Sequence, residues 1–445
     1  MLQCFQFSVF NKISGIQIDP KCKKQMRLFR FESTWLKDEK CSNIVKEIWV
    51  EGALRSDENC FSTCMEQCCE ALSQWNMQEF GHIGKKLVKA QDFLQLLEVR
   101  SAGMSNTDEV CQQRAEVNRL LDLEERMWKQ RSSNPWLKEG DRNTRFFHKK
   151  ASNRKQCNTI SRVMDESDTW QENDDKISEV IIAYYQNLFT TSQPDISQEF
   201  LEAIKLGVTP QMNSMLIRDF SAVEVKKALD QMYSLKSPGP DNMPSLFYQH
   251  FWQVVGDSVV TCVLNFIINS TLPHNFHETH IFLIPKVKSP TKVSKYRPIS
   301  LTNVVYKLAS KVLVDRLKTF IPSLITEIKS AFLFERLITD NALVAFEVMN
   351  NISQRKTRKT GSMALKLDMS KDFDRVEWSC LEKIMTKMGF HFRWISMVMS
   401  CVAFVTYSIR INGVPRERIT PTRGLAKGGM GFRDLKSFNL ALLAK

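Results

Sequence analysis

The sequence predicts an α+β protein in which a helical N-terminal region precedes a part with mixed helices and strands. Between residues 42 and 132, apolar residues recur three and four positions apart among many charges, a spacing typical of amphipathic helices. Beyond residue 278, the stretch 279–288 is strand-like, and apolar and polar residues alternate in 363–369 and 404–411, which predicts strands. A chain of 445 residues with 43% hydrophobic residues is long enough for two or three domains with buried cores.

The net charge of +13 favours a polyanionic partner, because each Lys or Arg placed on a phosphate releases counterions. A basic surface that contacts only solvent gives the same net charge. No stretch approaches the roughly 20 apolar residues that span a bilayer, so we expect no membrane partner. Residues 1–20 lack a basic start and a clean cleavage site, and therefore do not predict a signal peptide.

The twelve cysteines are scattered and form no C-x-x-C pair, which predicts reduced thiols in an intracellular protein. Cys60, Cys64 and Cys68 recur every four residues and therefore share one face of a helix. That face is either a zinc site or a buried apolar stripe with Phe61 and Met65. The apolar neighbours favour the stripe.

Several local signals fix the expected helices and turns of the second half. Residues 174–189 predict an amphipathic helix, and Ser221 with Glu224 forms a capping box that starts another. Pro and Gly residues enforce a turn at 236–241. Residues 303–321 predict a long helix. The following signals predict the start of a helix at Thr339 and Asp340 and a type I′ hairpin turn at Asn412 and Gly413.

Basic residues gather between positions 142 and 162, where no acidic residue occurs. The seven cations are Arg142, Arg145, Lys149, Lys150, Arg154, Lys155 and Arg162. Phe146 and Phe147 lie among them. Cations neutralise phosphates and aromatic rings stack on unpaired bases, so the segment predicts a contact with RNA or DNA. The two phenylalanines fit base stacking and anchorage to the core equally well.

The stretch 363–378 changes from a period of two to helical spacing, and a helix is expected from Asp374 to Met388. Asp368 therefore stands at the exit of a strand, where a carboxylate can meet solvent and a cation. The aromatic Phe373 follows five residues later. The alternative is a core strand with a surface carboxylate that caps the next helix.

This stretch resembles motif A of reverse transcriptases, and most of residues 28–425 resembles the reverse transcriptase of a plant LINE-type (non-LTR) retrotransposon. The resemblance is carried, in order, by the segments 27–39, 136–148, 236–249, 279–301, 329–341, 363–378 and 421–425. It implies the fingers and an incomplete palm of the right-handed reverse transcriptase fold behind the helical region.

The resemblance divides the chain into five parts. Residues 1–27 remain unassigned, and 28–135 would be a helical connector downstream of an endonuclease that the sequence lacks. Residues 136–220 would form a basic region before the fingers. Residues 221–425 would form partial fingers and palm, and 426–445 resemble a segment that normally lies downstream of the polymerase domain.

The resemblance also implies roles for single residues. Asp368 would hold catalytic Mg²⁺, and Phe373 would screen the sugar of the incoming nucleotide. Arg297, with Lys286 as a second cation, would bind the triphosphate, for which Arg supplies a planar fork of donors. Each of these two cations also fits an ordinary exposed side chain. Arg423, at the start of motif B, would contact nucleic acid. The family usually has Ala where this chain has Asp372.

The catalytic set implied by the resemblance is incomplete. The family takes a second pair of carboxylates from an aromatic-Ala-Asp-Asp turn in motif C, and this sequence has no such turn. Most of motif B is missing after Leu425. The expectation is an RNA-directed DNA polymerase by descent, now inactive, with RNA template, DNA primer or target and deoxynucleoside triphosphates as partners. A non-catalytic RNA- or DNA-binding remnant is the alternative. The family implies a nuclear or cytoplasmic location.

Overall fold

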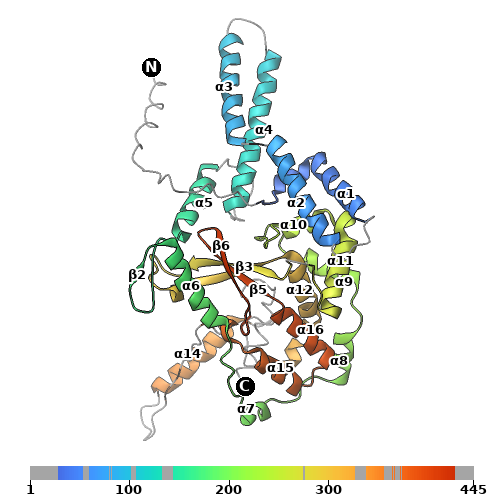
Figure 1. The fold of residues 1–445 in the computed structure, drawn as a ribbon, viewed down its shortest axis with the longest axis vertical. Coiled ribbons are helices and arrows are strands. Elements are labelled where there is room, and N and C mark those ends of the chain that lie inside the picture. The colour runs from blue at the N-terminus through green and yellow to red at the C-terminus, as the bar shows by residue number, and fades with distance from the viewer. Residues whose placement is uncertain are drawn as a thin grey trace.

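The structure is a computed structural model, and helices predominate in it around one four-stranded sheet (Figure 1). It describes residues 29–53, 60–79, 81, 83–101, 107–132, 144–273, 276–325, 337–354, 363, 365, 371 and 373–425. This mixture of helix and sheet agrees with the predicted α+β class.

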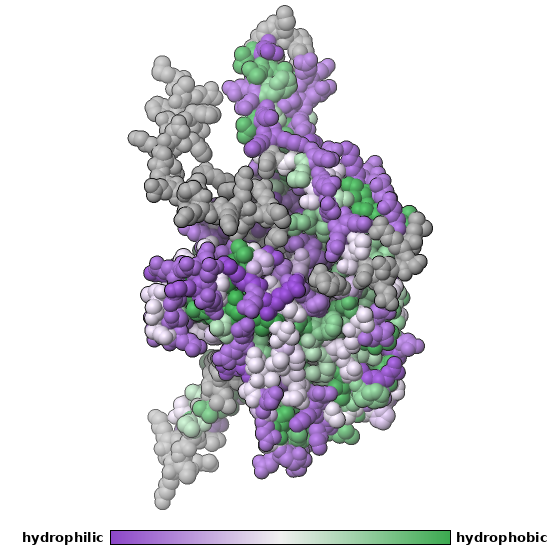
Figure 2. All heavy atoms as spheres, viewed as in Figure 1, coloured by the Kyte–Doolittle hydropathy of each residue, from purple (hydrophilic) through white to green (hydrophobic). Residues whose placement is uncertain are grey.

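The N-terminal region is helical, as predicted. After the 3₁₀-helix η1 (Ser33–Lys37), α1 (Glu39–Ala53) and α2 (Cys60–Glu79) join the same hydrophobic core as the sheet. In contrast, α3 (Ile83–Ser101) and α4 (Thr107–Ser132) project from the body as a pair (Figure 1). A small hydrophobic cluster of buried residues, separate from the main core, lies between them. Hydrophilic residues cover most of this pair (Figure 2). The break predicted at 103–106 lies outside the described residues.

The cysteine stripe on α2 is apolar. Cys64 and Cys68 are buried together with Phe61 and Met65. Burial raises the pKa of the Cys68 thiol far above its ordinary value, which keeps it protonated and apolar. Among the described residues, no group of three or more His, Cys, Asp or Glu side chains could hold a metal ion. The buried stripe is therefore confirmed in preference to the zinc site.

Seven helices and two short strands lie between α4 and the four-stranded sheet in the described part of the chain. They are α5 (Thr144–Asn158), β1 (Val163–Met164), β2 (Trp170–Gln171), α6 (Asp174–Phe189), α7 (Gln198–Glu202), α8 (Pro210–Ile217), α9 (Ala222–Asp230), α10 (Ser245–His250) and α11 (Trp252–Asn269). Helix α6 has the predicted bounds, and the side chain of Asn173 caps it. Both hydrogen bonds of the predicted capping box join Ser221 and Glu224 at the start of α9.

Helix α11 differs from the expectation that no segment approaches the length of a membrane span. By length and composition alone, it is the one helix in the described part of the chain that is long and apolar enough to cross a membrane. The buried residues Val255, Val259, Val263 and Phe266 recur on one face and belong to the common core. This packing accounts for the apolar composition, so the length test is weak support for a span.

The four-stranded sheet has the order β4-β3-β5-β6. The strands β3 (Glu278–Pro285) and β4 (Tyr296–Thr302) form an antiparallel hairpin around the short η2 (Val293–Lys295). On its other side, β3 pairs in parallel with β5 (Thr406–Ile411). The hairpin of β5 and β6 (Val414–Ile419) turns at Asn412 and Gly413, whose positive φ angles of 52° and 88° confirm a type I′ turn.

The connection from β4 to β5 contains most of the remaining elements. They are α12 (Val304–Lys318), α13 (Ile321–Leu324), α14 (Ile338–Gln354), η3 (Phe373–Arg375), α15 (Trp378–Lys387) and α16 (Phe392–Ala403). Helix α14 projects from the body (Figure 1) and exposes apolar side chains such as Phe346 and Met349. The strand predicted at 363–369 lies outside the described residues, apart from the exposed Met363 and Leu365.

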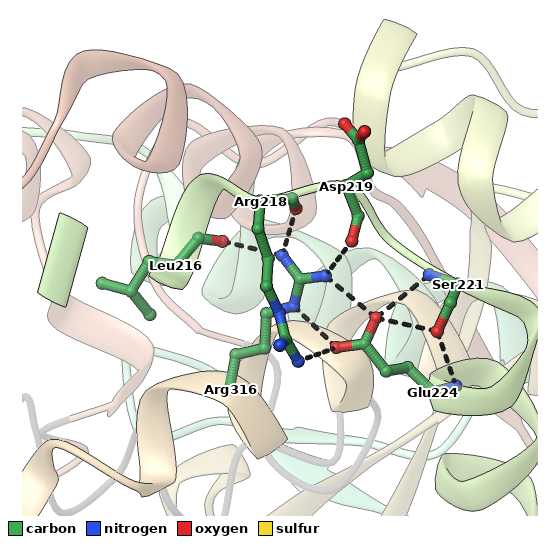
Figure 3. A network of polar contacts seen from close by, with 6 residues as sticks. All are labelled: Leu216, Arg218, Asp219, Ser221, Glu224 and Arg316. Atoms are coloured by element: carbon green, nitrogen blue, oxygen red, sulfur yellow. Dashed lines mark hydrogen bonds and ion pairs between the residues drawn. The ribbon is translucent and has the colours of Figure 1, made fainter. Parts of the chain in front are cut away.

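A buried charge network ties α12 to the loop between α8 and α9 (Figure 3). The Nε and Nη2 of Arg316 donate to the two carboxylate oxygens of Glu224 at 2.8 and 2.9 Å. Its remaining donors reach the carbonyl oxygens of Leu216, Arg218 and Asp219. The guanidinium is therefore fully satisfied although Arg316 is only 8% exposed.

We expect Glu224→Gln to destabilise the protein by about 3 kcal/mol, because it leaves the buried charge of Arg316 without a counter-charge. Urea unfolding measures this difference. The matched control is Asp230→Asn, which removes an exposed ion pair with Lys226 and should cost less than about 0.5 kcal/mol. An equal loss of unfolding free energy in the two variants would contradict the conclusion that Glu224 compensates the buried charge of Arg316.

The pH dependence checks the same network. Burial alone would raise the pKa of Glu224, but hydrogen bonds from Arg316 and Ser221 outweigh it and hold the pKa at about 2, below the ordinary 4.5. A lowered folded pKa stabilises the fold above pH 4.5, and this stabilisation is lost as the pH falls towards 2. The difference between wild type and Glu224→Gln should shrink across this range.

Candidate functional site

The loop end of the β3–β4 hairpin carries the two predicted phosphate-binding cations. Arg297 is exposed on β4 opposite Ile284, and Lys286 is exposed just beyond the end of β3. The backbone N–H of Lys286 donates to the carbonyl of Lys295 at 2.9 Å, and its Nζ donates to the carbonyl of Ser294 at 3.0 Å. The hairpin thus presents Lys286 and Arg297 at one end, where an anion can meet both.

A second part of the site forms where η3 meets the segment 421–425, which we call the junction. The N–H of Leu425 donates to the carbonyl of Phe373, and that of Gly424 to the carbonyl of Val376, each at 2.8 Å. Phe373, the predicted sugar screen, is only 9% exposed here. The junction therefore fixes the backbone at Phe373 and just after it.

The helix after η3 does not begin as the sequence predicted. Asp374 was expected to cap a helix over 374–388, but it lies within η3 and is only 6% exposed. Helix α15 starts at Trp378, and its N-cap residue is Glu377, which makes no side-chain cap bond. The expectation was wrong because Val376 and Glu377 are extended to pair with the junction strand, where Glu377 bridges to Arg423.

Arg423, predicted to contact nucleic acid, lies inside the junction. Its Nε donates to the carbonyl of Leu188 at 2.9 Å, and its Nη2 to the carbonyl of Asn187 at 3.2 Å. Its Nη1 forms an ion pair with Glu377 at 3.1 Å, and both side chains are largely buried. In this arrangement the guanidinium caps the C-terminal end of α6, where a cation is favourable.

Lys371 lies beside η3 with its ammonium against two tyrosine rings of α6. Burial lowers the pKa of Lys371 to about 8, although Asp374 acts in the opposite direction. Lys286 and Arg375 also lower this pKa.

Two predicted site residues fall outside the described residues, namely the metal ligand Asp368 and the basic Arg142. The structure thus describes the surroundings of Asp368 on its C-terminal side only. Arg145 lies on α5, but its side chain is not described.

The basic segment forms helix α5, and its cations are distributed around the helix. Lys149, Arg154 and Lys155 are exposed, and Lys150 is half-buried with its ammonium 5.8 Å from the Phe146 ring centre. The two phenylalanines differ in burial, and a stacking role stays a prediction. Phe147 is buried, with 1% of its surface exposed, whereas Phe146 is 47% exposed and remains accessible.

A shallow groove of about 600 Å³ lies between α15 and α16, away from these cations. Its walls are mainly apolar and include Phe392, Ile395, Met399 and Phe404, with Glu382 at one side. Because no Lys or Arg lines this groove, it offers no binding site for a phosphate.

The model of the family described as "Reverse transcriptase (RNA-dependent DNA polymerase)" matches residues 284–430. The match spans Lys286, Arg297, η3 and the junction. The chain contains a reverse transcriptase domain.

Two proteins of non-LTR retrotransposons are similar to the chain. It is 26% identical over 450 residues to the "Transposon TX1 uncharacterized 149 kDa protein" of Xenopus laevis, covering 95% of this chain and 33% of that protein. It is 24% identical over 255 residues to the "Retrovirus-related Pol polyprotein from type-2 retrotransposable element R2DM" of Drosophila melanogaster, covering 56% of this chain and 22% of that protein. The chain thus spans a third or less of these relatives.

Sequence reasoning missed the residues that hold the junction together. Tyr184 and Tyr185 were read only as part of the apolar face of a helix, and Lys371 was passed over between Asp368 and Phe373. Gly424 carried a signal, because glycine is favoured where φ is positive, and its φ is +90°. A Cβ at this position would lie 2.6 Å from the carbonyl oxygen of Asp374.

We expect Gly424→Ala to destabilise the junction by about 2 kcal/mol or more, because it adds both backbone strain and a steric clash. Hydrogen exchange of the amides in 421–425 should rise, and urea unfolding should shift to lower concentration. The matched control is Gly84→Ala on α3, where a new Cβ meets only Glu124 Oε1 at 4.0 Å. The control should be neutral or stabilising by up to about 1 kcal/mol. Unchanged exchange at 421–425 in Gly424→Ala would contradict the description of the junction.

Proposed function

We propose that the chain derives from the RNA-directed DNA polymerase of a plant LINE-type (non-LTR) retrotransposon and represents fingers with an incomplete palm. The observation that carries the proposal is the reverse transcriptase match over 284–430, which includes the hairpin with both cations. The partners we propose are an RNA template, a DNA primer or target and deoxynucleoside triphosphates. The proposed location is nuclear or cytoplasmic.

In this proposal, each described site residue has a separate task. Arg297 and Lys286 bind the triphosphate, and the planar guanidinium of Arg297 offers two parallel N–H donors to phosphate oxygens. Phe373 borders the sugar of the incoming nucleotide. Its nearly complete burial and the bond from Leu425 to its carbonyl support a fixed position for the ring.

The reverse transcriptase family implies a divalent metal, and we propose Mg²⁺ with Asp368 as one ligand. The described residues do not fit such a site, because they contain no group of carboxylates, histidines or cysteines that could hold a metal ion. Asp374 is buried beside Lys371 and tied into η3, so it is no substitute. We therefore derive no step of the reaction through the metal.

We further propose that the chain on its own is inactive. Two metal ions normally activate the primer hydroxyl and stabilise the leaving pyrophosphate, and a single carboxylate is too few to hold both. The sequence lacks the aromatic-Ala-Asp-Asp turn that would supply the second pair.

Primer extension on an RNA template with Mg²⁺ tests this proposal. We expect wild type to extend the primer no further than Asp368→Asn, because the carboxylate set is incomplete. Arg297→Ala should weaken the binding of deoxynucleoside triphosphates about tenfold or more, because it removes a charge-assisted bidentate contact. Extension that Asp368→Asn abolishes would show that other residues complete the site, and would contradict inactivity.

A second candidate function is non-catalytic binding of RNA or DNA, and α5 is the observation that favours it. Lys149, Arg154 and Lys155 of this helix are exposed, and the exposed Phe146 ring lies among them. This composition suits contact with a single strand, in which phosphates meet the cations and a base meets the ring.

We expect the quadruple change of Lys149, Lys150, Arg154 and Lys155 to Gln to weaken the binding of labelled single-stranded RNA. It should also reduce the slope of log affinity against log salt by up to about 3, because each lost phosphate contact contributes about 0.7. Filter binding at two salt concentrations measures both effects.

The matched control changes four exposed cations of α3 to Gln, namely Lys85, Lys86, Lys89 and Arg100. It removes the same net charge and should have a smaller effect. Equal losses from both sets would mean that only net charge matters, and salt-independent binding would exclude this function.

A further inference from the structure

The ammonium of Lys371 lies in a corner formed by two aromatic rings of α6. The rings of Tyr184 and Tyr185 are 5.3 Å apart and nearly perpendicular, at 86°. The Nζ of Lys371 lies 4.3 Å from the centre of the Tyr184 ring and 5.2 Å from that of Tyr185. The nitrogen itself is buried, and no oxygen in the described part of the chain accepts a hydrogen bond from it.

An ammonium without hydrogen-bond acceptors is costly to bury, so the two rings must supply most of its compensation. The negative faces of aromatic rings attract a cation, and the attraction grows when water is excluded. Lys371 also has a positive φ of 55°, which is uncommon for a residue with a side chain. Both features are unfavourable for an isolated lysine. They indicate that contacts with its surroundings, and not its own conformational preference, hold Lys371 in place.

Helix α6 holds the other side of the junction as well. The carbonyl of Phe189, at its last residue, accepts hydrogen bonds from the N–H groups of Thr422 and Arg423 at 2.9 and 3.1 Å. The ring of Phe189 packs on Tyr407 of β5, with ring centres 4.8 Å apart. Helix α6 therefore contacts Lys371 just before Phe373, the junction segment 421–425 and strand β5 of the sheet.

This helix lies outside residues 284–430, which the reverse transcriptase match covers. We infer that Tyr184 and Tyr185 of α6 are positioning residues that hold Lys371, and with it the turn around Phe373, in the geometry of the nucleotide site. The inference rests on the proposed nucleotide function. The tyrosines touch neither the nucleotide nor the reacting atoms, and act through Lys371.

We call the contact of Tyr184 and Tyr185 with Lys371 the clamp. Hydrogen exchange of residues 371–376, followed by mass spectrometry, tests directly whether the clamp holds this turn. Tyr184→Leu and Lys371→Met should each raise exchange there about 2- to 30-fold, the range that corresponds to the strength of cation–π contacts. The conservative Tyr184→Phe keeps the ring and should retain most of the protection. Tyr233→Leu, at a tyrosine that is 61% exposed on the surface, is the control and should change nothing at 371–376.

Binding of dTTP and UTP to the same full-length variants provides the readout that a purely structural role would not move. Tyr184→Leu should weaken dTTP more than UTP, because a loose Phe373 discriminates less against the ribose hydroxyl, and Tyr184→Phe should restore the preference. Unchanged exchange at 371–376 in both Tyr184→Leu and Lys371→Met would overturn the clamp. Raised exchange with an unchanged dTTP-to-UTP ratio would overturn its role in the nucleotide site. If wild type binds neither nucleotide, the proposed function fails, whereas the exchange comparison still decides the clamp.

Discussion

The parallel pairing of β3 with β5 is the constraint on which the candidate site depends. A parallel pair cannot be closed by a tight turn, and the chain must leave the sheet and return in the same direction. Here the return takes about 120 residues, from Pro285 to Thr406, and includes the helices from α12 to α16. Both the hairpin cations and the turn around Phe373 lie on this excursion.

Three buried cations in the structure meet the cost of burial in different ways. Arg316 donates to a carboxylate and three carbonyl oxygens, which fixes its surroundings rigidly. Burial lowers the pKa of Lys307 to about 8, and the carboxylate of Asp241 opposes this shift. Lys371 has ring faces in place of oxygen partners. Its contact is less directional than a network of hydrogen bonds, so it tolerates small movements of the turn.

Local sequence patterns predicted local structure well. The helix over 174–189, the capping box at Ser221 and the Asn412–Gly413 turn were all found from spacing and turn chemistry. The same kind of reasoning failed at Asp374, because a long-range pairing with the junction displaced the start of the helix. The roles of Asp368, Arg297 and Lys286 followed from family resemblance and remain predictions.

The tertiary partners of the site were not readable from local patterns. A pair of tyrosines on an amphipathic helix looks like ordinary core, and nothing near Tyr184 in the sequence points to Lys371. Arg423 shows that a role suggested by family resemblance can also differ from the contacts that the residue makes. A cation in a nucleic-acid-binding family suggests a phosphate contact, yet here its donors bond to backbone carbonyls and a carboxylate of the chain itself.

The bonds between α6 and the junction have a consequence for how the chain reaches its folded state. The N–H of Thr191 donates to the hydroxyl of Thr422, a contact between residues 231 positions apart. Helix α6 can form early from local signals, but its partners in the junction emerge from the ribosome only after more than two hundred further residues. During that interval its apolar face, including Ile181 and Tyr185, lacks part of its final contacts. Synthesis of this chain therefore passes through a long stage in which a preformed helix must avoid misassembly, and chaperone demand should depend on the speed of translation across residues 190–425.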